Sequence, residues 1–284
     1  MDVANNNFGA ILPHEHLKEV LKCNTRHDGR HLFEFRNMTI NVGSIDTADG
    51  SALVQMGNTM IVCGVKAELT KPLASQPHKG IVVPNVELPP LCASHFKPGP
   101  PSDQAQIASQ LLSDIIKSPN FIDLEQLCVC KDKIVWVIYC DVVCLSYDGN
   151  MMDAAVAAVT AALANTLLPV IQYKEDDQTV KAIQESDKKV CLPLKKKLVS
   201  STFSLFQSSI IIADPTLKEE QVAGSELTVI IDQRGIPFHL HRPGGFPLED
   251  GVLQKCLVRA VENSNRLQVL LSKFCPSAVA EFSE

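Results

Sequence analysis

The stretch from Ile134 to Leu168 constrains the fold of this chain more than any other. It opens with an apolar run rich in Val, Ile, Trp and Tyr, which is typical of a strand covered on at least one face. Asp148-Gly149-Asn150 then breaks the run with turn-forming residues, and Asp153 suits the first turn of the alanine-rich helix that should follow. Because the first backbone N–H groups of a helix have no partner within it, a strand, glycine turn and helix in this order can hold an anion.

The composition excludes several classes of protein. The 284 residues allow one large or two modest domains, and the 45% hydrophobic fraction is enough for a substantial core. The formal net charge is −6, which argues against a free-standing RNA-binding module, because such modules usually carry a basic excess. No apolar run is long enough to predict a membrane span, and the first residues lack the features of a secretory signal.

The ten cysteines favour free thiols over a metal site. Most of them sit inside apolar runs, as Cys63, Cys140, Cys144 and Cys256 do, and their spacing gives no paired C-x-x-C sets. We expect buried thiols in a reducing compartment, with a structural zinc site as the alternative. No cofactor or bound metal ion is expected.

The first half of the chain predicts strands followed by helices. Short turns at Ala48-Asp49-Gly50 and Gly57-Asn58 indicate an antiparallel meander. The strands are expected at Met38–Ile45, Ser51–Gln55, Thr59–Leu69 and, between prolines, Gly80–Leu88. A helix should begin at Ser102 or Asp103 and end near Ser118, with an apolar stripe of Ile107, Leu111, Leu112, Ile115 and Ile116.

The second half repeats this order, so the fold class is α+β with antiparallel sheet. The polar segment Gln172–Lys189 predicts an exposed connection. A long amphipathic helix should run from Glu249 to Phe274, with Val252, Leu253, Cys256, Leu257, Ala260 and Val261 on its buried stripe. Strands are expected at Val190–Leu194, Ser201–Phe206, Ser209–Ala213, Leu227–Asp232 and Pro237–Leu240. We therefore divide the chain into an extension with a short helix (1–23), a first lobe (24–188) and a second lobe (189–284).

Basic residues at two places leave alternatives open. Arg26, Arg30 and Arg36 cluster before the first strand, where they are either ordinary surface charge or a contact for a phosphate or a partner. His95 and Lys97 flank an aromatic residue in a loop, a combination suited to nucleic acid, although an ordinary surface loop has the same composition. His239 and His241 would share a strand face, and without a third ligand we interpret them as structural.

Several short motifs, taken together, resemble the ribonuclease PH family. They occur in the family's order and cover about residues 24–273. Within the family the sequence is similar to subunits of the archaeal 42 type, not the 41 type, and to eukaryotic exosome ring subunits. The motifs are R-x-D-G-R (Arg26–Arg30), E-F-R (Glu34–Arg36), G-S-x-x-T-A-D-G-S-A-L-V (Gly43–Val54), G-N-T (Gly57–Thr59), C-G-V-K-A-E (Cys63–Glu68), V-P-N-V-E-L-P-P-L (Val83–Leu91), G-P-P (Gly99–Pro101), Y-D-G-N-x-x-D-A (Tyr147–Ala154), A-D-P-T-x-x-E-E (Ala213–Glu220) and P-G-G (Pro243–Gly245).

The resemblance implies a fold, an assembly and a set of partners. The fold would be the ribonuclease PH fold, with two βαβα-type lobes related to domain 2 of ribosomal protein S5. The assembly would be a six-membered exosome ring with single-stranded RNA in its central channel, in the nucleus, nucleolus and cytoplasm. The implied partners are ring subunits of the 46 type and the messenger-RNA-transport type, and an S1-domain cap protein. His95 and Lys97 become candidates for RNA contact.

The resemblance also implies that the catalytic site is degenerate. Active members carry a motif like D-G-G-T-R-T-A, in which Thr and Arg hold the attacking phosphate, whereas this chain has Asn150, Met151, Met152 and Asp153 in those positions. A thioether offers no donor to phosphate, and Asp153 would add like charge. Glu220 and Glu226 fall roughly where active members place two Asp, and we interpret them as leftover or surface acids. We therefore expect a non-catalytic structural ring subunit that supports rRNA processing and mRNA decay. The alternative is a phosphorolytic 3′–5′ exoribonuclease that uses a compensating cation such as Arg26, Arg30 or Lys97.

Overall fold

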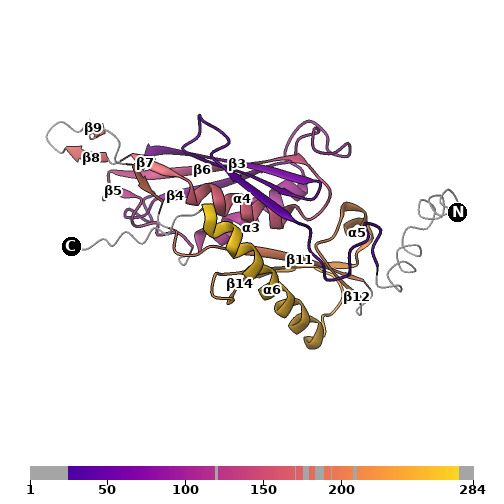
Figure 1. Ribbon diagram of the computed structural model, residues 1–284. Helices are drawn as coiled ribbons and strands as arrows, with labels where there is room; N and C mark the ends of the chain where they lie inside the picture. The colour runs from indigo at the N-terminus through magenta and orange to yellow at the C-terminus, as the bar shows by residue number, and fades with distance from the viewer. Residues whose placement is uncertain are drawn as a thin grey trace.

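The computed structural model describes residues 25–118, 121–169, 171–174, 179–182, 189–192, 194–206 and 210–274. Two sheets form the body of this part of the chain, and α4 lies between them (Figure 1). The predicted extension and short helix of residues 1–23 lie outside the described residues.

The first sheet begins with the predicted antiparallel meander. β1 (Met38–Val42) pairs with β2 (Gly50–Met56), and β2 pairs with β3 (Thr59–Thr70) across the turn at Gly57-Asn58. β1 ends three residues earlier than Ile45, because Gly43 adopts a φ of 72° and turns the backbone away from the sheet. Alternate residues of these strands are buried, so one face of the meander packs on the core.

β6 (Ile134–Ser146) completes this sheet and leads to the central turn. It pairs antiparallel with β3 and parallel with β4 (Ile81–Glu87), while β5 (Cys128–Cys130) pairs with its first residues. The strand order is β1-β2-β3-β6-β4. β5 was not predicted from the sequence, because three residues carry too little pattern to distinguish a strand from a loop.

α3 (Asp103–Lys117) packs against β4, and Ser102 caps it by accepting a hydrogen bond from the backbone N of Ala105 at 3.3 Å. The predicted stripe is buried with one exception. Ile107 is 53% exposed and does not belong to the stripe, because it faces a cavity instead of the sheet. The residues that do form the stripe are Leu111, Leu112, Ile115 and Ile116.

α4 (Met151–Ala164) is buried along nearly its whole length. It packs against β2 and β3 of the first sheet and against β11 of the second. Small side chains allow this close approach, and a Cβ on Gly50 would lie 2.8 Å from the carbonyl oxygen of Ala162. The alanine-rich composition of the helix is therefore what lets two sheets share it.

The second sheet has the order β12-β11-β13-β14 and is antiparallel throughout. α6 (Asp250–Phe274) lies across it, with Val252, Cys256 and Ala260 buried and Leu253, Leu257 and Val261 half-buried, as the stripe predicted. The six-residue helix α5 (Leu217–Val222) was not predicted. The strands are β11 (Val199–Phe206), β12 (Ile210–Ala213), β13 (Ser225–Ile231) and β14 (Pro237–His241).

Short strand pairs occupy the segment between the two sheets. β7 (Leu167–Pro169) pairs with β10 (Lys189–Cys191), and β8 (Ile171–Lys174) pairs with β9 (Thr179–Ala182). The exposed connection predicted at Gln172–Lys189 thus contains strands that the sequence analysis did not predict, β8 and β9. These pairs depend on backbone hydrogen bonds, which leave no apolar alternation in the sequence.

Most of the described cysteines are buried, as their places in apolar runs predicted. The eight described cysteines are free thiols, and five of them are buried: Cys63, Cys92, Cys140, Cys144 and Cys256. Burial raises the pKa of the Cys140 thiol to about 12. Within the described ranges, no helix is both long and apolar enough to cross a bilayer.

Candidate functional site

The turn between β6 and α4 has the strand–turn–helix geometry that the sequence predicted. Gly149 and Asn150 adopt left-handed conformations, with φ of 76° and 50°, which glycine and asparagine tolerate best. The loop before α5 lies directly against this turn, since a Cβ on Gly149 would lie 2.5 Å from the backbone N of Leu217. The second sheet therefore reaches the start of α4.

Asp214 is the centre of the contacts between this turn and the rest of the molecule. Its Oδ2 accepts from the backbone N and the Nε of Arg36 at 2.8 and 2.9 Å, and its Oδ1 accepts from Nη2 of the same arginine at 2.8 Å. Arg30 Nη1 donates to Oδ2 at 2.9 Å, and Asn150 Nδ2 donates to Oδ1 at 2.7 Å. Burial tends to raise the pKa of Asp214, but the hydrogen bonds and charge of Arg36 outweigh it, so this pKa lies below its usual range.

Arg36 also holds the turn itself. Its Nη1 donates to the carbonyl oxygen of Asp148 at 3.0 Å, and its Nη2 donates to that of Gly149 at 3.2 Å. The hydroxyl of Thr59 donates to the Gly149 carbonyl oxygen at 2.8 Å. The carbonyl groups of the turn are thus satisfied by the protein.

Arg26 is buried against α5 and makes a separate ion pair. Its Nε donates to Glu219 Oε1 at 2.9 Å, and its Nη2 pairs with the other carboxylate oxygen. Its Nη1 donates to the carbonyl oxygen of Ala213 at 2.8 Å. Arg26, Arg30 and Arg36 are therefore not ordinary surface charge, because they connect the segment before β1 to the second lobe.

Asp153 turns away from the helix start and into the core. Its Oδ1 accepts from Ser200 Oγ at 2.6 Å and Thr202 Oγ1 at 2.8 Å, and its Oδ2 accepts from the backbone N of Thr202 at 2.9 Å and from Asn150 Nδ2 at 2.7 Å. Burial raises the pKa of Asp153. The prediction that this carboxylate adds like charge to a phosphate cradle is thus wrong, because it ties α4 to β11.

Glu220 occupies the helix start instead. Its Oε1 accepts from the backbone N of Asn150 at 2.5 Å, and its Oε2 accepts from the hydroxyl of Tyr147 at 2.9 Å. Burial raises the pKa of Glu220 to about 7, the hydrogen bond from Asn150 opposes this, and the charge of Glu226 adds to it. Glu220 is therefore not a surface acid, because its carboxylate is buried and accepts a hydrogen bond from the N–H of Asn150 at the helix start.

A cavity of about 360 Å³ opens beside this carboxylate. The sequence-predicted residues that line it are His95, Asn150, Met151, Met152, Glu220 and Glu226. Lys97 and Asp153 are not part of its wall; Lys97 is exposed on the loop, two residues from His95. The structure therefore brings most of the candidate site together around one space.

Glu226 lies on β13 and is partly buried in the cavity wall. Burial raises its pKa. Among the described residues, no hydrogen bond or ion pair reaches its carboxylate. An acid in this position is not an ordinary surface residue, so that interpretation is also wrong for Glu226.

Sequence reasoning missed several residues of this wall. Tyr147 donates to Glu220 and stacks edge-on against His95, with ring centroids 5.8 Å apart. Its place directly before the Asp-Gly turn was the only signal that could have found it. His241, interpreted as structural, also lines the cavity, as do Gln104, Thr202 and Thr228.

The pKa of Glu220 predicts a pH-dependent stability. The folded state binds the Glu220 proton more tightly than the unfolded chain, whose pKa is near 4.5, so this contribution is complete below about pH 4.5 and is lost as pH rises through about 7. Changing Glu220 to Gln should remove this slope. We expect the variant to gain on the order of 2 kcal/mol relative to wild type between pH 5 and pH 8, measured by urea unfolding. If the free energy of unfolding varied with pH in the same way for both proteins, the raised pKa of Glu220 would be contradicted.

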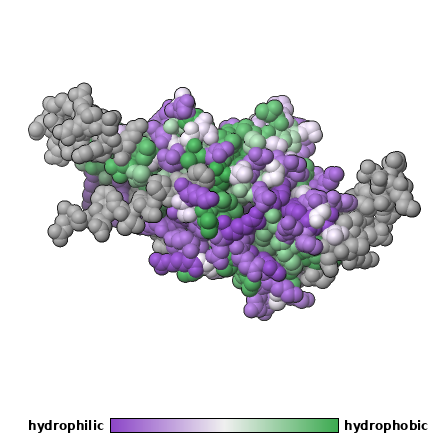
Figure 2. Space-filling model, viewed as in Figure 1, coloured by the Kyte–Doolittle hydropathy of each residue, from purple (hydrophilic) through white to green (hydrophobic). Residues whose placement is uncertain are grey.

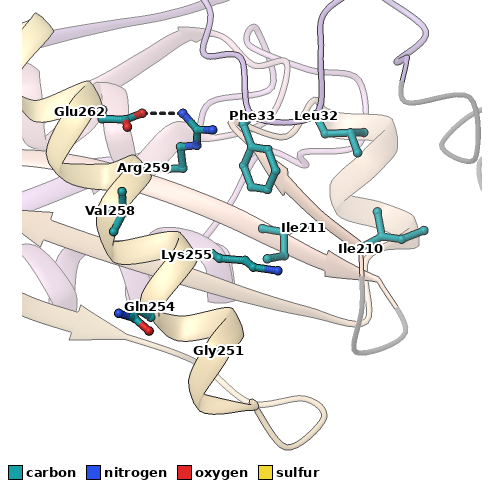
Figure 3. A pocket seen from close by; sticks show the side chains of 10 residues that line it. All are labelled: Leu32, Phe33, Ile210, Ile211, Gly251, Gln254, Lys255, Val258, Arg259 and Glu262. Atoms are coloured by element: carbon teal, nitrogen blue, oxygen red, sulfur yellow. Dashed lines mark hydrogen bonds and ion pairs between the residues drawn. The ribbon is translucent and has the colours of Figure 1, made fainter.

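A larger groove of about 790 Å³ lies on another side of the second sheet (Figure 3). Leu32 and Phe33 face β12 and α6 across it, and Arg259 lies over the Phe33 ring at 5.3 Å while pairing with Glu262 at 2.7 Å. Its wall combines apolar side chains with the polar Gln254, Lys255, Arg259 and Glu262, a composition typical of a contact surface.

Comparison with known proteins identifies relatives along most of the chain. The ribonuclease PH models match residues 34–169 (3′ exoribonuclease family, domain 1) and residues 198–263 (3′ exoribonuclease family, domain 2). The chain is 39% identical over 250 residues to the exosome complex component rrp43 of Schizosaccharomyces pombe, which covers 88% of this chain and 92% of that protein. It is 32% identical over 277 residues to the exosome complex component Rrp42 of Pyrococcus furiosus, which covers 93% and 99%.

Solved structures also resemble this chain. A chain of the structure described as "archaeoglobus fulgidus exosome with RNA bound to the active site" matches with a TM-score of 0.80 and 28% identity, over 94% of this chain and 99% of that one. Rice Rrp46 matches with a TM-score of 0.65 at 16% identity, over 87% of this chain and 98% of that one, which supports the fold alone. Since both lobe models match in order, and relatives above 30% identity span most of the chain, this protein belongs to the ribonuclease PH family.

Proposed function

We propose that this chain is a non-catalytic structural subunit of an RNA exosome core ring. The relatives named above carry the names of exosome complex components, and the solved structures that match include an archaeal exosome core, with a TM-score of 0.76 at 27% identity. In this role the chain shapes the ring and its RNA channel, and supports 3′-to-5′ processing and degradation of RNA by other subunits.

One observation carries the loss of catalysis: the Glu220 carboxylate accepts the Asn150 N–H at the start of α4. Phosphorolysis needs an inorganic phosphate held by donors and cations, and a helix start alone contributes only about 0.3–1 kcal/mol at an exposed site. Met151 and Met152 line the cavity without offering donors, and no Lys or Arg stands among its described wall residues. A second anion would meet a carboxylate already in place.

The alternative is a phosphorolytic exoribonuclease with a degenerate phosphate site. A single observation favours it, namely a carboxyl with a pKa of about 7 beside a cavity, as a general acid requires. The compensating cations that it needs are not available from Arg26, Arg30 or Arg36, because all of them are paired with Glu219 or Asp214. Lys97 is then the cation left from the predicted set.

The assembly and partners follow from the same proposal. The neighbours would be ribonuclease PH-like subunits of the 46 type and the messenger-RNA-transport type, with an S1-domain cap protein above and single-stranded RNA in the channel. The groove in Figure 3 and the exposed Leu73, Leu91 and Val269 supply apolar surface for such contacts, and Figure 2 shows hydrophobic patches interrupting a hydrophilic face. The lobe boundaries at 24–188 and 189–284, and a nuclear, nucleolar and cytoplasmic location, remain predictions.

His95 and Lys97 are the proposed RNA contacts. Both are exposed, and Phe96 between them is buried, so this residue anchors the loop while its neighbours face outward. Exchanging Lys97 for Glu in the assembled ring should weaken RNA protection against nuclease, because phosphate contacts are electrostatic. Unchanged protection would remove Lys97 from the RNA path.

An activity assay tests the loss of catalysis. The purified chain, incubated with poly(A), Mg²⁺ and inorganic phosphate, should release nucleoside diphosphate no faster than a blank without protein. Glu226→Gln serves as the matched variant and should be indistinguishable from wild type. Phosphate-dependent release that disappears in Glu226→Gln would establish the enzyme alternative instead.

A further inference from the structure

We propose that the cavity beside Glu220 binds a small organic cation, a primary amine with a short apolar body. The inference rests on one part of the proposed function, that this cavity does not hold phosphate, and it does not need the ring assignment. It is argued from hydrogen-bond acceptors that the protein leaves unused.

The unused acceptors come from different elements. Glu226 of β13 carries a carboxylate with no partner among the described residues. Each oxygen of Glu220 accepts one hydrogen bond, from Asn150 and from Tyr147, and a carboxylate oxygen can accept two. Asn150 also lines the cavity, but its Oδ1 has almost no accessible surface, so the acceptors within reach of a ligand are those of the two glutamates. A group that carries several N–H donors and a positive charge complements these atoms.

The charged side chains of the cavity wall, with histidine counted as neutral, are acidic. The wall contains the two glutamates and no Lys or Arg in the part of the chain described here. Arg36 lies close enough to affect Glu220, but its guanidinium is bound to Asp214 and to turn carbonyls. Burial, followed by the charge of His239, lowers the pKa of His241, which disfavours a positive charge on this imidazole beside the carboxylates.

The remaining wall suits a short hydrocarbon. Met151, Met152 and Leu217 line the cavity, and Ile107 of α3 faces it although most of its side chain is exposed. Methionine adapts to ligands of irregular shape. The volume of about 360 Å³ lies at the small end of the range for organic ligands. A bare divalent ion fits less well, because the described residues contain no group of three or more His, Cys, Asp or Glu side chains placed to ligate one.

Binding should strengthen as pH rises. A cation beside Glu220 favours its ionised form, so at neutral pH binding would release a proton from this carboxyl. The groups that face Glu220 are Glu226, Tyr147 and Arg36, with His95 and His241 on the cavity wall. Burial and the charge of Glu220 raise the pKa of Tyr147, so Tyr147 stays protonated and does not titrate in this range.

Calorimetric titration of the full chain with butane-1,4-diamine tests the proposal. We expect a dissociation constant in the millimolar range or tighter at pH 7.5, weakened at least about tenfold by Glu226→Gln and at pH 6. Butane-1,4-diol, which has the same length and no charge, should not bind. Glu125→Gln, which changes net charge equally at a 68% exposed side chain, is the matched control and should bind like wild type.

Glu226→Gln removes an unpaired, partly buried charge, so it should fold at least as well as wild type, and thermal unfolding checks this. Equal diamine binding by wild type and Glu226→Gln, equal binding of the diol, or no heat at about 10 mM diamine would overturn the proposal. Binding of Mg²⁺ in place of the diamine, with the same dependence on Glu226, would overturn it as well. Each outcome is independent of the poly(A) assay, because that assay reports phosphate-dependent chemistry and not occupancy by an amine.

Discussion

Replacing Asp214 with alanine should lower the free energy of unfolding by about 3–5 kcal/mol. The Asp214 side chain is 0% exposed and accepts hydrogen bonds from Arg30, Arg36 and Asn150. Its removal leaves the Arg36 guanidinium, 8% exposed, without its salt-bridge partner, and leaves Arg30 with Asp28 alone. A buried charge that loses its partner costs much more than the pair contributed while intact, because the charge cannot return to water.

Asp28 provides the matched control. Its carboxylate also pairs with Arg30, at 2.6 Å, but its side chain is 35% exposed. Asp28→Ala should cost no more than about 1 kcal/mol, since solvent screens the pair. Urea unfolding of both variants, followed by far-UV circular dichroism, measures the difference. Similar losses for the two variants would mean that Asp214 is not the centre of the contacts between the two sheets.

Replacing Gly149 with alanine should destabilise the protein by at least about 3 kcal/mol. Two costs add at this position. The φ of 76° strains any residue with a Cβ, and the new Cβ would lie 2.5 Å from the backbone N of Leu217 and 2.8 Å from the carbonyl oxygen of Pro215. Both close atoms belong to backbone, so the loop before α5 has to move away from the turn.

Gly29 separates these two costs. Its φ is 82°, close to that of Gly149, but nothing lies within 4 Å of an added Cβ. Gly29→Ala should therefore cost only the conformational strain, about 1–2 kcal/mol. Thermal and urea unfolding compare the two variants. The additional loss of stability in Gly149→Ala measures how closely the loop before α5 packs against the start of α4. An equal loss of stability at both positions would contradict the close contact between Gly149 and the backbone before α5.

The sequence predicted the local framework of the site well. The run that becomes β6, the turn and the alanine-rich α4 all carry signals within a few residues, so periodicity and turn chemistry were sufficient. The meander of β1, β2 and β3 was predicted for the same reason, since its turns are short. The motifs of the ribonuclease PH family added the fold.

The contacts that decide the chemistry were not predictable in this way. Arg26 pairs with Glu219, 193 residues away, and Arg36 pairs with Asp214 across 178 residues. No local pattern marks such a partner, so surface charge and ligand contact were the only interpretations that the sequence offered. Glu220 shows the same limit: its spacing suggested a remnant of catalysis, whereas tertiary packing turns its carboxylate onto the helix start.

The distance along the chain between the arginines and their acidic partners also matters during protein synthesis. At about 5–20 residues per second, the separation of 178 residues places the synthesis of Arg36 about 9–36 s before that of Asp214. During that interval the guanidinium groups that are buried in the folded protein have no acidic partner from the second lobe. The alanine-rich helix α4 can pack against the first sheet only. Arg30 and Arg36 therefore lack Asp214, and α4 lacks its contact with β11, until the second sheet has been synthesised.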